Sequence, residues 1–418
     1  MLNPGYELDY LMLDWYRHMG AAERRTFWAC FGGWALDALD VQIYSFVVPA
    51  LIALWHISKG QAGLLATSAL VISAFGGWTA GMLADRIGRA RLLMIMVAWF
   101  AFFTFLSGFT NNFEQLLVVR GLQGFGFGGE WAAGSVLIGE VIRGADRGKA
   151  VGAVQSAWAV GWGAAAVLAT IVFQLLPQEI AWRALFFIGI LPALLVFYIR
   201  ARVPEPAIFH EAAQSRAQRS TLEIFRKLLP TTILGAALST GAQGGYYAIT
   251  TFLPTFLRNE RHLTVLGTGG YLAVIIVGSW FGYIVSAYLA DSIGRRKNFF
   301  IFAIGSLVIA IAYTQTEISD SLMFVLGFPL GFFASGIFSG LGPVLTELFP
   351  TSVRGAGQGF CYNFGRGIGA FFPTLVGFLS AQVALGVAIG IFAAISYAIV
   401  ILAALMLPET RGRELKAN

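Results

Sequence analysis

The sequence predicts an all-α integral membrane protein with twelve transmembrane helices in two similar six-helix halves. Three observations lead to this fold class: the composition, the number of apolar stretches, and charged motifs that recur at one offset. Of the 418 residues, 57% are hydrophobic and only 12% are charged, with a mean hydropathy of +0.72, whereas about a quarter of an ordinary soluble domain is charged. So few charges exclude a water-soluble fold of this size, and the lipid bilayer is the expected environment.

Twelve apolar stretches are bounded by charged or turn-forming residues. Each is long enough for a membrane-spanning helix, which needs about 20 residues. The predicted spans cover residues 27–54, 62–84, 92–110, 114–139, 149–176, 183–201, 229–257, 267–290, 298–316, 321–346, 356–380 and 384–407.

The remaining segments are short and polar. They predict an N-terminal tail over 1–26, a half over 27–202, a central linker over 203–228 that is partly amphipathic helix, a second half over 229–407, and a tail over 408–418. Acidic residues precede the first apolar stretch, so we expect an uncleaved anchor and not a signal peptide. Cys30 and Cys361 lack metal-ligand spacing, and we expect neither a metal nor a cofactor.

The basic residues predict the orientation. Of the 28 Lys and Arg residues, 22 fall on the side of the two termini. The opposite side receives only Lys59, Arg183, Arg258 and Arg261. Cytoplasmic loops carry such an excess, so both termini are predicted to be cytoplasmic, and the net charge of +6 reflects topology and not nucleic-acid binding. Short loops and the lack of any Asn-x-Ser/Thr sequence favour a bacterial inner membrane.

Charged motifs recur with nearly one offset. Asp85 follows the second span and Asp291 the eighth, 206 positions apart, while Glu140 and Glu347 follow the fourth and tenth spans, 207 apart. This spacing indicates duplication of a six-helix unit. Repeats of this kind build secondary transporters, whose substrate site lies at midplane between the halves.

The same cytoplasmic loops predict a conformational latch. An aspartate at a helix end can meet the positive N-terminal end of another helix, and an arginine can pair with a cytoplasmic acid, so that one state is held closed. The alternative is that these charges only set the topology. The candidate latch residues are Gly81, Asp85, Arg86, Gly88, Arg89, Glu140, Arg147, Asp291, Arg295, Glu347 and Arg354.

The loop from Gly81 to Arg91, with its weaker copy at 291–297, resembles the signature cytoplasmic loop of the major facilitator superfamily. The resemblance covers nearly the whole chain, and it implies a secondary transporter that works by alternating access. Within that superfamily, four stretches resemble the proton symporters for aromatic acids, sialate and monocarboxylates. They are Asp37-Ala-Leu-Asp40, the run from Arg120 to Trp131, the stretch from Trp182 to Gly189, and Asn363-Phe-Gly-Arg366.

Two other stretches keep alternatives open. The sequences at 203–206 and 408–412 are similar to those of sugar porters, so a proton symporter for a sugar or polyol remains a second reading. The fifth span lacks the proline of drug–proton antiporters between Trp158 and Ala164. Drug efflux is therefore the weaker alternative.

Acidic residues within the spans are candidates for proton coupling. Asp37 and Asp40 share one helix face at depths of about 15 and 20 Å, and Arg120 lies as deep as Asp40. Two carboxylates beside one arginine can bind and release a single proton as a unit. Asp37 or Asp40 is thus the predicted proton carrier, with Arg120 modulating release; a static salt bridge is the alternative. Glu130 is predicted about 6 Å from the cytoplasmic end of its helix. Three roles are open for it: a second proton site, a residue of the inner gate, or a solvated charge at the helix end.

Arg366 is the predicted substrate-binding residue. It lies near the midplane, and a guanidinium there suits a bidentate contact to a carboxylate. The alternative is an ion pair with Asp37 or Asp40. Asn363 is expected on the same face, and further polar and aromatic residues are expected to line the pocket: Gln42, Tyr44, Gln123, Gln155, Trp158, Gln243, Tyr246 and Tyr247.

Together these features predict a transporter and not an enzyme, which takes up a small organic anion with a proton and is driven by the proton gradient. The expected partners are that anion, protons and the bilayer, without nucleic acid, and we expect a monomer. The sequence leaves the acid open among aromatic carboxylates, muconate-like dicarboxylates, sialate and lactate-like monocarboxylates.

Overall fold

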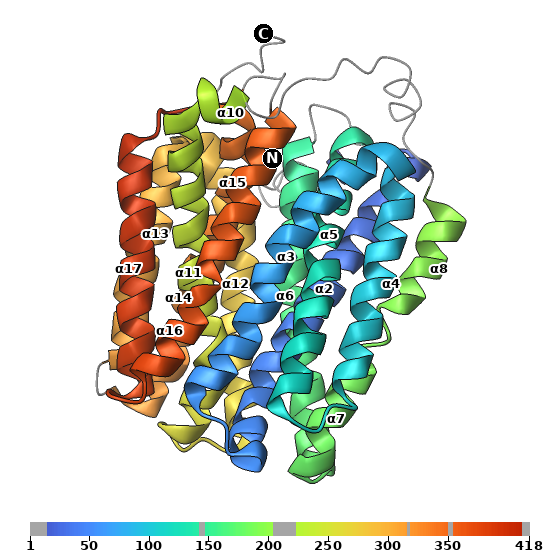
Figure 1. The fold of residues 1–418 in the computed structure, drawn as a ribbon. Coiled ribbons are helices and arrows are strands. Elements are labelled where there is room, and N and C mark those ends of the chain that lie inside the picture. The colour runs from blue at the N-terminus through green and yellow to red at the C-terminus, as the bar shows by residue number, and fades with distance from the viewer. Residues whose placement is uncertain (1–14, 142–146, 204–222, 316–317, 350–353, 412–418) are drawn as a thin grey trace, which may run out of the picture.

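A computed structural model describes residues 15–141, 147–203, 223–315, 318–349 and 354–411. Nearly all of these residues are helical, and none of them forms a strand. The first half contains α2 (Ala21–Trp55), α3 (Lys59–Ile87), α4 (Arg89–Ser107), α5 (Phe113–Val141), α6 (Arg147–Leu175), α7 (Gln178–Ile188) and α8 (Ala193–Arg202) (Figure 1).

The second half follows a single short helix, α10 (Glu223–Arg226), which is the only part of the predicted linker helix among the described residues. It contains α11 (Leu229–Asn259), α12 (Val265–Ile293), α13 (Arg295–Gln315), α14 (Asp320–Leu348), α15 (Arg354–Gly369), α16 (Phe371–Leu379) and α17 (Leu385–Met406). The twelve predicted spans correspond to these helices, and most ends agree within a few residues.

Two spans that the sequence predicts as continuous helices are broken. The sixth divides into α7 and α8 around Pro192, and the eleventh into α15 and α16 just before Pro373. Proline has no N–H for the carbonyl four residues earlier, and its ring crowds that carbonyl. Those carbonyls belong to Ile188 and Gly369, the last residues of α7 and α15.

Hydropathy separates the helices into two groups. By length and composition, nine helical segments of the described residues are apolar enough to cross a membrane. The helices α15 and α16 fall outside this group because each is too short, with 16 and 9 residues. The helices α5 and α11 also fall outside it, and α5, α11 and α15 carry glycines together with charged, amide or tyrosine side chains. Polar side chains within a bilayer normally face a cavity or a partner, so these helices are expected to line the site.

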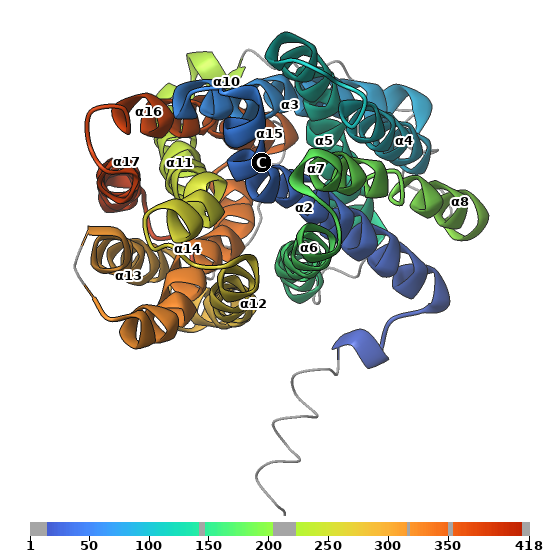
Figure 2. The same ribbon diagram turned by 90° about the horizontal axis from the view of Figure 1, so that it is seen from below.

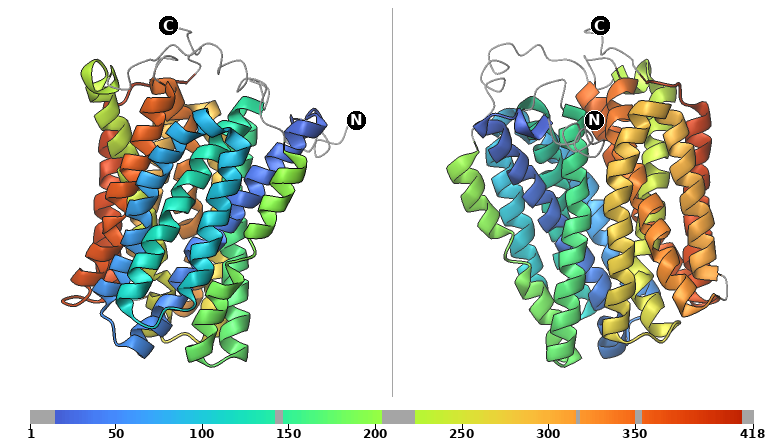
Figure 3. Two further views of the ribbon diagram at one scale, coloured as in Figure 1. Left: turned by 45° about the vertical axis from the view of Figure 1, so that its right-hand side comes forward. Right: turned by 180° about the vertical axis from the view of Figure 1, so that it is seen from behind.

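The halves lie side by side, with their interface running through the middle of the molecule (Figures 2 and 3). Across it, α3 packs on α15 and α16, α6 on α12, and α2 on α11. At the end opposite the termini the contact is close: a Cβ on Gly63 would lie 2.6 Å from the Pro373 carbonyl oxygen. Glycine is therefore required there, and the halves are closed on the extracellular side.

The backbone repeats as the sequence does. Gly88 and Gly294 have φ angles of 99° and 104°, and His56 and His262 have φ angles of 51° and 55°. The members of each pair are 206 positions apart. Equivalent turns thus carry the same left-handed backbone in both halves, as expected for a duplicated unit.

Candidate functional site

Three charged side chains from three helices meet where the two halves join. Asp37 comes from α2, Glu130 from α5 and Arg366 from α15, and each is at most 2% exposed. Asp37 interacts electrostatically with both Glu130 and Arg366, and Glu130 also interacts with Arg366. The interface between the halves therefore encloses two carboxyl groups and one guanidinium, which we call the central charge cluster.

Gly33 allows the Glu130 carboxyl group to approach α2. A Cβ on Gly33 would lie 2.2 Å from Glu130 Oε1, far inside van der Waals contact. Gly33 precedes Asp37 by one helical turn, so the two residues share a face of α2. The missing side chain thus makes room for the second carboxyl group beside the first.

The predicted position of Glu130 near the cytoplasmic end of its helix was wrong. The helix α5 continues to Val141, which places Glu130 about 16 Å from its end. The side chain is 2% exposed and is not a solvated helix-end charge. Glu130 is instead part of a buried helix interface.

Arg366 lies against two aromatic rings. Its guanidinium carbon is 4.7 Å from the centre of the Phe127 ring and 5.1 Å from that of Tyr362, which stabilises a buried cation. In the described part of the chain, Arg366 Nε and Nη1 have no hydrogen-bond partner. Buried polar atoms without partners are costly, so this cluster is chemically equipped to accept a polar ligand.

A second charged group lies within the first half alone. Asp40 and Arg120 interact electrostatically, and the Arg120 guanidinium carbon lies 4.7 Å from the centre of the Tyr44 ring. The Tyr44 hydroxyl donates a hydrogen bond of 2.5 Å to the Ala62 carbonyl oxygen. The sequence left open which aspartate would interact with which arginine; in the structure Arg120 lies with Asp40, and Arg366 with Asp37.

Tyr246 connects the two halves beside the central charge cluster. Its hydroxyl accepts hydrogen bonds from Trp158 Nε1 at 2.6 Å and from Gln42 Nε2 at 3.2 Å. Its ring packs edge-on against that of Tyr247, with 5.8 Å between centres, and Tyr247 also interacts electrostatically with Arg366. Four of the predicted pocket residues therefore form one polar and aromatic wall.

The other predicted pocket residues are placed differently. Asn363 donates to the Gly359 carbonyl oxygen at 3.0 Å, and its amide oxygen faces Gly77 on α3, so it packs the halves together. Gln243 donates to the Tyr362 carbonyl oxygen at 2.9 Å. Gln123 and Gln155 are buried; the amide oxygens of Gln123 and Gln243 are without hydrogen-bond partners among the described residues.

The sequence did not identify Gly33, Phe127, Tyr362, Trp34 or Trp131 as site residues. The Trp34 and Trp131 rings lie 4.2 Å apart between α2 and α5, next to the cluster. A helical spacing signal was present, because Phe127 is three residues before Glu130 and Tyr362 is four before Arg366, which places each on the face of its charged neighbour.

Of the candidate latch residues that carry charge, the structure describes the side chains of Arg295 and Glu347, both in the second half. Arg295 donates to both carboxylate oxygens of Glu347, from Nε at 3.2 Å and from Nη2 at 2.9 Å, and Thr410 Oγ1 donates to Glu347 at 2.5 Å. Gly88 and Gly294 form the turns that precede α4 and α13. The remaining candidates lie outside the residues whose side chains are described: Gly81, Asp85, Arg86, Arg89, Glu140, Arg147, Asp291 and Arg354.

Comparison with known proteins agrees with this architecture. A probable 4-methylmuconolactone transporter of Cupriavidus pinatubonensis is 44% identical over 403 residues, covering 96% of this chain and 94% of that protein. A cis,cis-muconate transport protein of Acinetobacter baylyi is 28% identical, covering 90% and 92% of the two chains. The solved structure of a proton:xylose symporter matches with a TM-score of 0.73 at 18% identity, covering 94% of this chain and 98% of the symporter, and so shows the same fold.

The family model described as Major Facilitator Superfamily matches residues 30–314 and 273–418, which together cover most of the chain. The protein is thus a multi-pass transporter of the plasma membrane and not an enzyme, with both termini in the cytoplasm, as the sequence predicts. The chain belongs to the Major Facilitator Superfamily.

Proposed function

We propose that the protein takes up a small organic carboxylate together with a proton by alternating access. The observation that carries this proposal is the central charge cluster, in which a buried arginine has unpaired N–H groups beside two carboxyl groups at the interface of the halves. Arg366 binds the substrate carboxylate, and Asp37 and Glu130 hold the proton.

Charge balance couples the two ligands. Two ionised carboxylates and one guanidinium leave one excess negative charge in a buried site, and one shared proton removes it. A substrate carboxylate that binds Arg366 brings another negative charge, and it is bound more tightly when a carboxyl group is protonated. Substrate and proton therefore raise each other's affinity, as reciprocal coupling requires. Asp40 beside Arg120 is the alternative proton site.

The polar and aromatic wall favours a substrate with an unsaturated or aromatic carbon skeleton. Trp158, Tyr246 and Tyr247 present ring faces and edges next to Arg366, and such rings pack favourably against flat ligands. The compounds named for the two relatives, 4-methylmuconolactone and cis,cis-muconate, are small and unsaturated. They are the first candidates for this chain.

The experiment is uptake into proteoliposomes with an imposed inward proton gradient, with and without a protonophore. The labelled panel contains 4-methylmuconolactone, cis,cis-muconate, benzoate, sialate, lactate and xylose. We expect carboxylates to accumulate only with the gradient, and Arg366→Ala to reduce uptake about a hundredfold, which corresponds to about 3 kcal/mol. Arg366→Lys keeps the charge but loses the bidentate geometry. Its uptake rate should therefore lie between that of the parent protein and that of Arg366→Ala.

Two results would contradict the proposal. Accumulation of xylose alone would assign the protein to the sugar symporters, and expulsion of substrates as protons enter would make it an antiporter. In the first case Arg366 would not be the carboxylate-binding residue, and in the second case the proposed coupling of uptake to proton entry would be wrong.

A further inference from the structure

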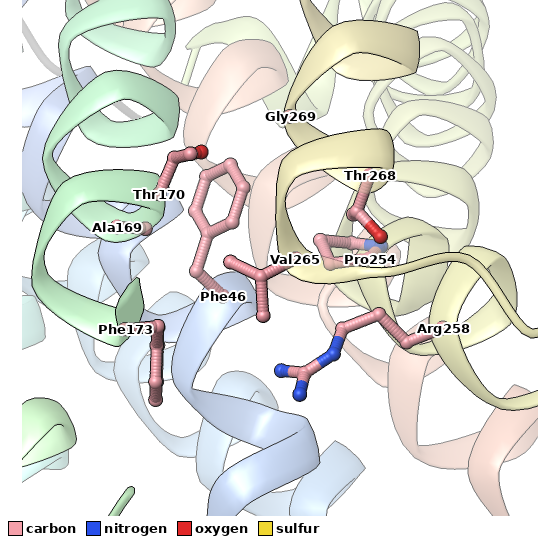
Figure 4. Close-up of a pocket in the computed structure, with 9 residues that line it drawn as sticks. All are labelled: Phe46, Ala169, Thr170, Phe173, Pro254, Arg258, Val265, Thr268 and Gly269. Carbon is pink, nitrogen blue, oxygen red and sulfur yellow. The ribbon is translucent and has the colours of Figure 1, made fainter. Parts of the chain in front are cut away.

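A pocket lies at the extracellular end of the interface between the halves, away from the central charge cluster. Phe46, Thr170 and Phe173 line it from α2 and α6, and Arg258 and Thr268 line it from α11 and α12 (Figure 4). We call it the outer pocket. Phe46 follows Asp37 by nine residues on α2, and Arg258 follows Tyr247 by eleven on α11, so both helices place this pocket about 14 to 16 Å outward from the central cluster.

Arg258 supplies a positive charge that no described carboxylate balances. Its guanidinium carbon lies 5.8 Å from the centre of the Phe173 ring, and no hydrogen bond or ion pair to it is found within the described ranges. Of the described acids at the same membrane face, Glu260 accepts from the backbone at the start of α17, and Asp320 pairs with Arg261 at 3.2 Å. Glu114 and Glu179 lie in the first turns of α5 and α7, and within the described ranges neither forms an ion pair with Arg258.

The other described arginines at the extracellular face donate hydrogen bonds to backbone carbonyl oxygens. Arg183 donates to the Gly108 and Thr110 carbonyl oxygens, both at 2.7 Å, and Arg261 donates to the Ile318 carbonyl oxygen at 2.7 Å. Arg258 therefore differs from Arg183 and Arg261 in having its donors available to a ligand.

Thr268 adds a second polar group to the outer pocket. It is 3% exposed, and its hydroxyl has no hydrogen-bond partner among the residues that the structure describes. Figure 4 shows this hydroxyl directed toward Pro254, on the pocket side of α12. A buried hydroxyl without a partner calls for a ligand or water, and Thr268 and Arg258 line the same pocket.

The outer pocket lies where the halves separate. A Cβ on Gly269 of α12 would lie 2.6 Å from Thr170 Oγ1 of α6, so the helices are in close contact beside the pocket. Opening of the extracellular side would widen this contact and expose Arg258 to the medium. The apolar wall of Phe46 and Phe173 then faces the carbon skeleton of an entering anion.

We infer that the outer pocket is a first, low-affinity binding site at which Arg258 and Thr268 receive the carboxylate of the substrate before it reaches Arg366. This inference rests on the proposed function for the identity of the anion. A lone positive charge at a narrow entrance raises the local concentration of anions and their rate of entry.

The first test is the concentration dependence of inward cis,cis-muconate transport. Arg258→Gln should raise the outside KM about tenfold at low ionic strength while the maximal rate changes less than about twofold, and the effect should shrink as salt screens the charge. Arg258→Lys should restore most of the affinity. Arg261→Gln is the matched control, because it removes a charge at the same membrane face outside the pocket, and its KM should stay near that of the parent.

The second test does not depend on transport. Thr170→Cys places a thiol in the outer pocket, and the native Cys30 and Cys361 are buried. An anionic sulfonate thiosulfonate should label this thiol about fivefold faster with Arg258 than with Arg258→Gln, whereas a cationic trimethylammonium thiosulfonate should show no such gain. If the ratio of the anionic to the cationic labelling rate is the same with Arg258 as with Arg258→Gln, the inference is overturned.

The two tests separate the inference from the proposed function. If labelling depends on Arg258 but the protein takes up no carboxylate, the outer anion site stands and the proposed substrate class fails. If carboxylate uptake is proton-driven but neither KM nor labelling responds to Arg258, the outer site fails and the proposed function stands.

Discussion

At the scale of single residues, the site depends on a side chain that is absent. Gly33 leaves the space that the Glu130 carboxyl group occupies beside Asp37. The atom that a Cβ would meet is the end of a flexible side chain, which can move without disturbing either helix. A substitution at this position therefore tests the site separately from the fold.

We predict that Gly33→Ala displaces the Glu130 carboxyl group and reduces proton-driven accumulation about tenfold or more, because a shift of about 1 Å in a binding group carries costs of that order. The melting temperature in detergent should change little. Gly134→Ala is the matched control, since its Cβ would lie 3.9 Å from Glu130 Oε1, in ordinary contact. Equal uptake by the two variants would remove Gly33 from the coupling mechanism.

Asp37 is the residue whose neutralisation should separate binding from coupling. We predict that Asp37→Asn abolishes concentrative uptake while exchange of labelled for unlabelled substrate continues. The amide has nearly the same volume as the carboxyl group, but it cannot bind and release a proton. The same assay on Asp40→Asn provides the comparison. Unchanged accumulation in Asp37→Asn, with loss in Asp40→Asn, would move the proton site to Asp40 beside Arg120.

At the scale of elements, the segment after α17 forms hydrogen bonds with the start of α13. The Glu409 carboxylate accepts from the backbone N–H groups of Arg295 at 2.9 Å and Arg296 at 3.1 Å, where a helix has unpaired donors and a positive dipole end. Arg296 in turn donates to the carbonyl oxygens of Ala404 and Leu405 at 3.0 and 2.8 Å. The cytoplasmic ends of α13 and α17 are thus joined from both sides.

This arrangement makes Glu409 a pH-dependent stabilising group. Partial burial acts to raise the pKa of Glu409, but backbone hydrogen bonds from Arg411, Arg295, Arg296 and Thr410 together hold the pKa below its usual value. A lowered pKa in the folded state stabilises the protein above the unfolded-state pKa, and this contribution is lost as the pH falls through the folded-state pKa.

We predict that Glu409→Gln lowers the melting temperature by a few degrees at pH 7, because a carboxylate cap is replaced by a neutral one. The difference between the two proteins should begin to shrink as the pH falls below the unfolded-state pKa of about 4.3. It should vanish once the pH is below the lowered pKa of the folded state, where the carboxylate of the parent protein is protonated. Thermal unfolding in detergent across this range is the measurement. A difference that is the same at every pH would show that Glu409 acts by packing and not by charge.

At the scale of the whole molecule, the extracellular ends of the halves are in contact. Thr67 Oγ1 on α3 lies 2.6 Å from Thr374 Oγ1 on α16 and donates to the Ala370 carbonyl oxygen at 2.5 Å. Alternating access requires these contacts to break when the site opens outward. A covalent link across them should therefore stop the cycle.

We predict that Thr67→Cys combined with Thr374→Cys loses more than about nine-tenths of its uptake on oxidation and regains it on reduction, because side chains this close can form a disulfide. The control is Ser279→Cys with Ser335→Cys, whose hydroxyls lie 2.9 Å apart within the second half. Its oxidation should leave uptake intact. If the oxidised Thr67→Cys/Thr374→Cys protein keeps full uptake, the halves do not separate at the contact between α3 and α16.

The sequence by itself determined the class of the protein, the twelve spans and their orientation. These features follow from the cost of transferring each short segment into lipid and from where the basic residues lie, and both are properties of the local sequence. The depth of Arg366, counted along one helix, is predicted for the same reason; the structure adds that its side chain is buried. The role of Arg366 in binding remains a prediction.

Only the tertiary structure decided which charges face one another. Asp37, Glu130 and Arg366 come from three helices, and their meeting depends on how each helix is rotated and how closely glycines such as Gly33 let the helices approach. The same holds for the unpaired Arg258 and Thr268 at the outer pocket. Hydropathy specifies that a segment enters the membrane, but side-chain packing between helices distant in sequence fixes the face that each presents, and that packing forms the candidate site.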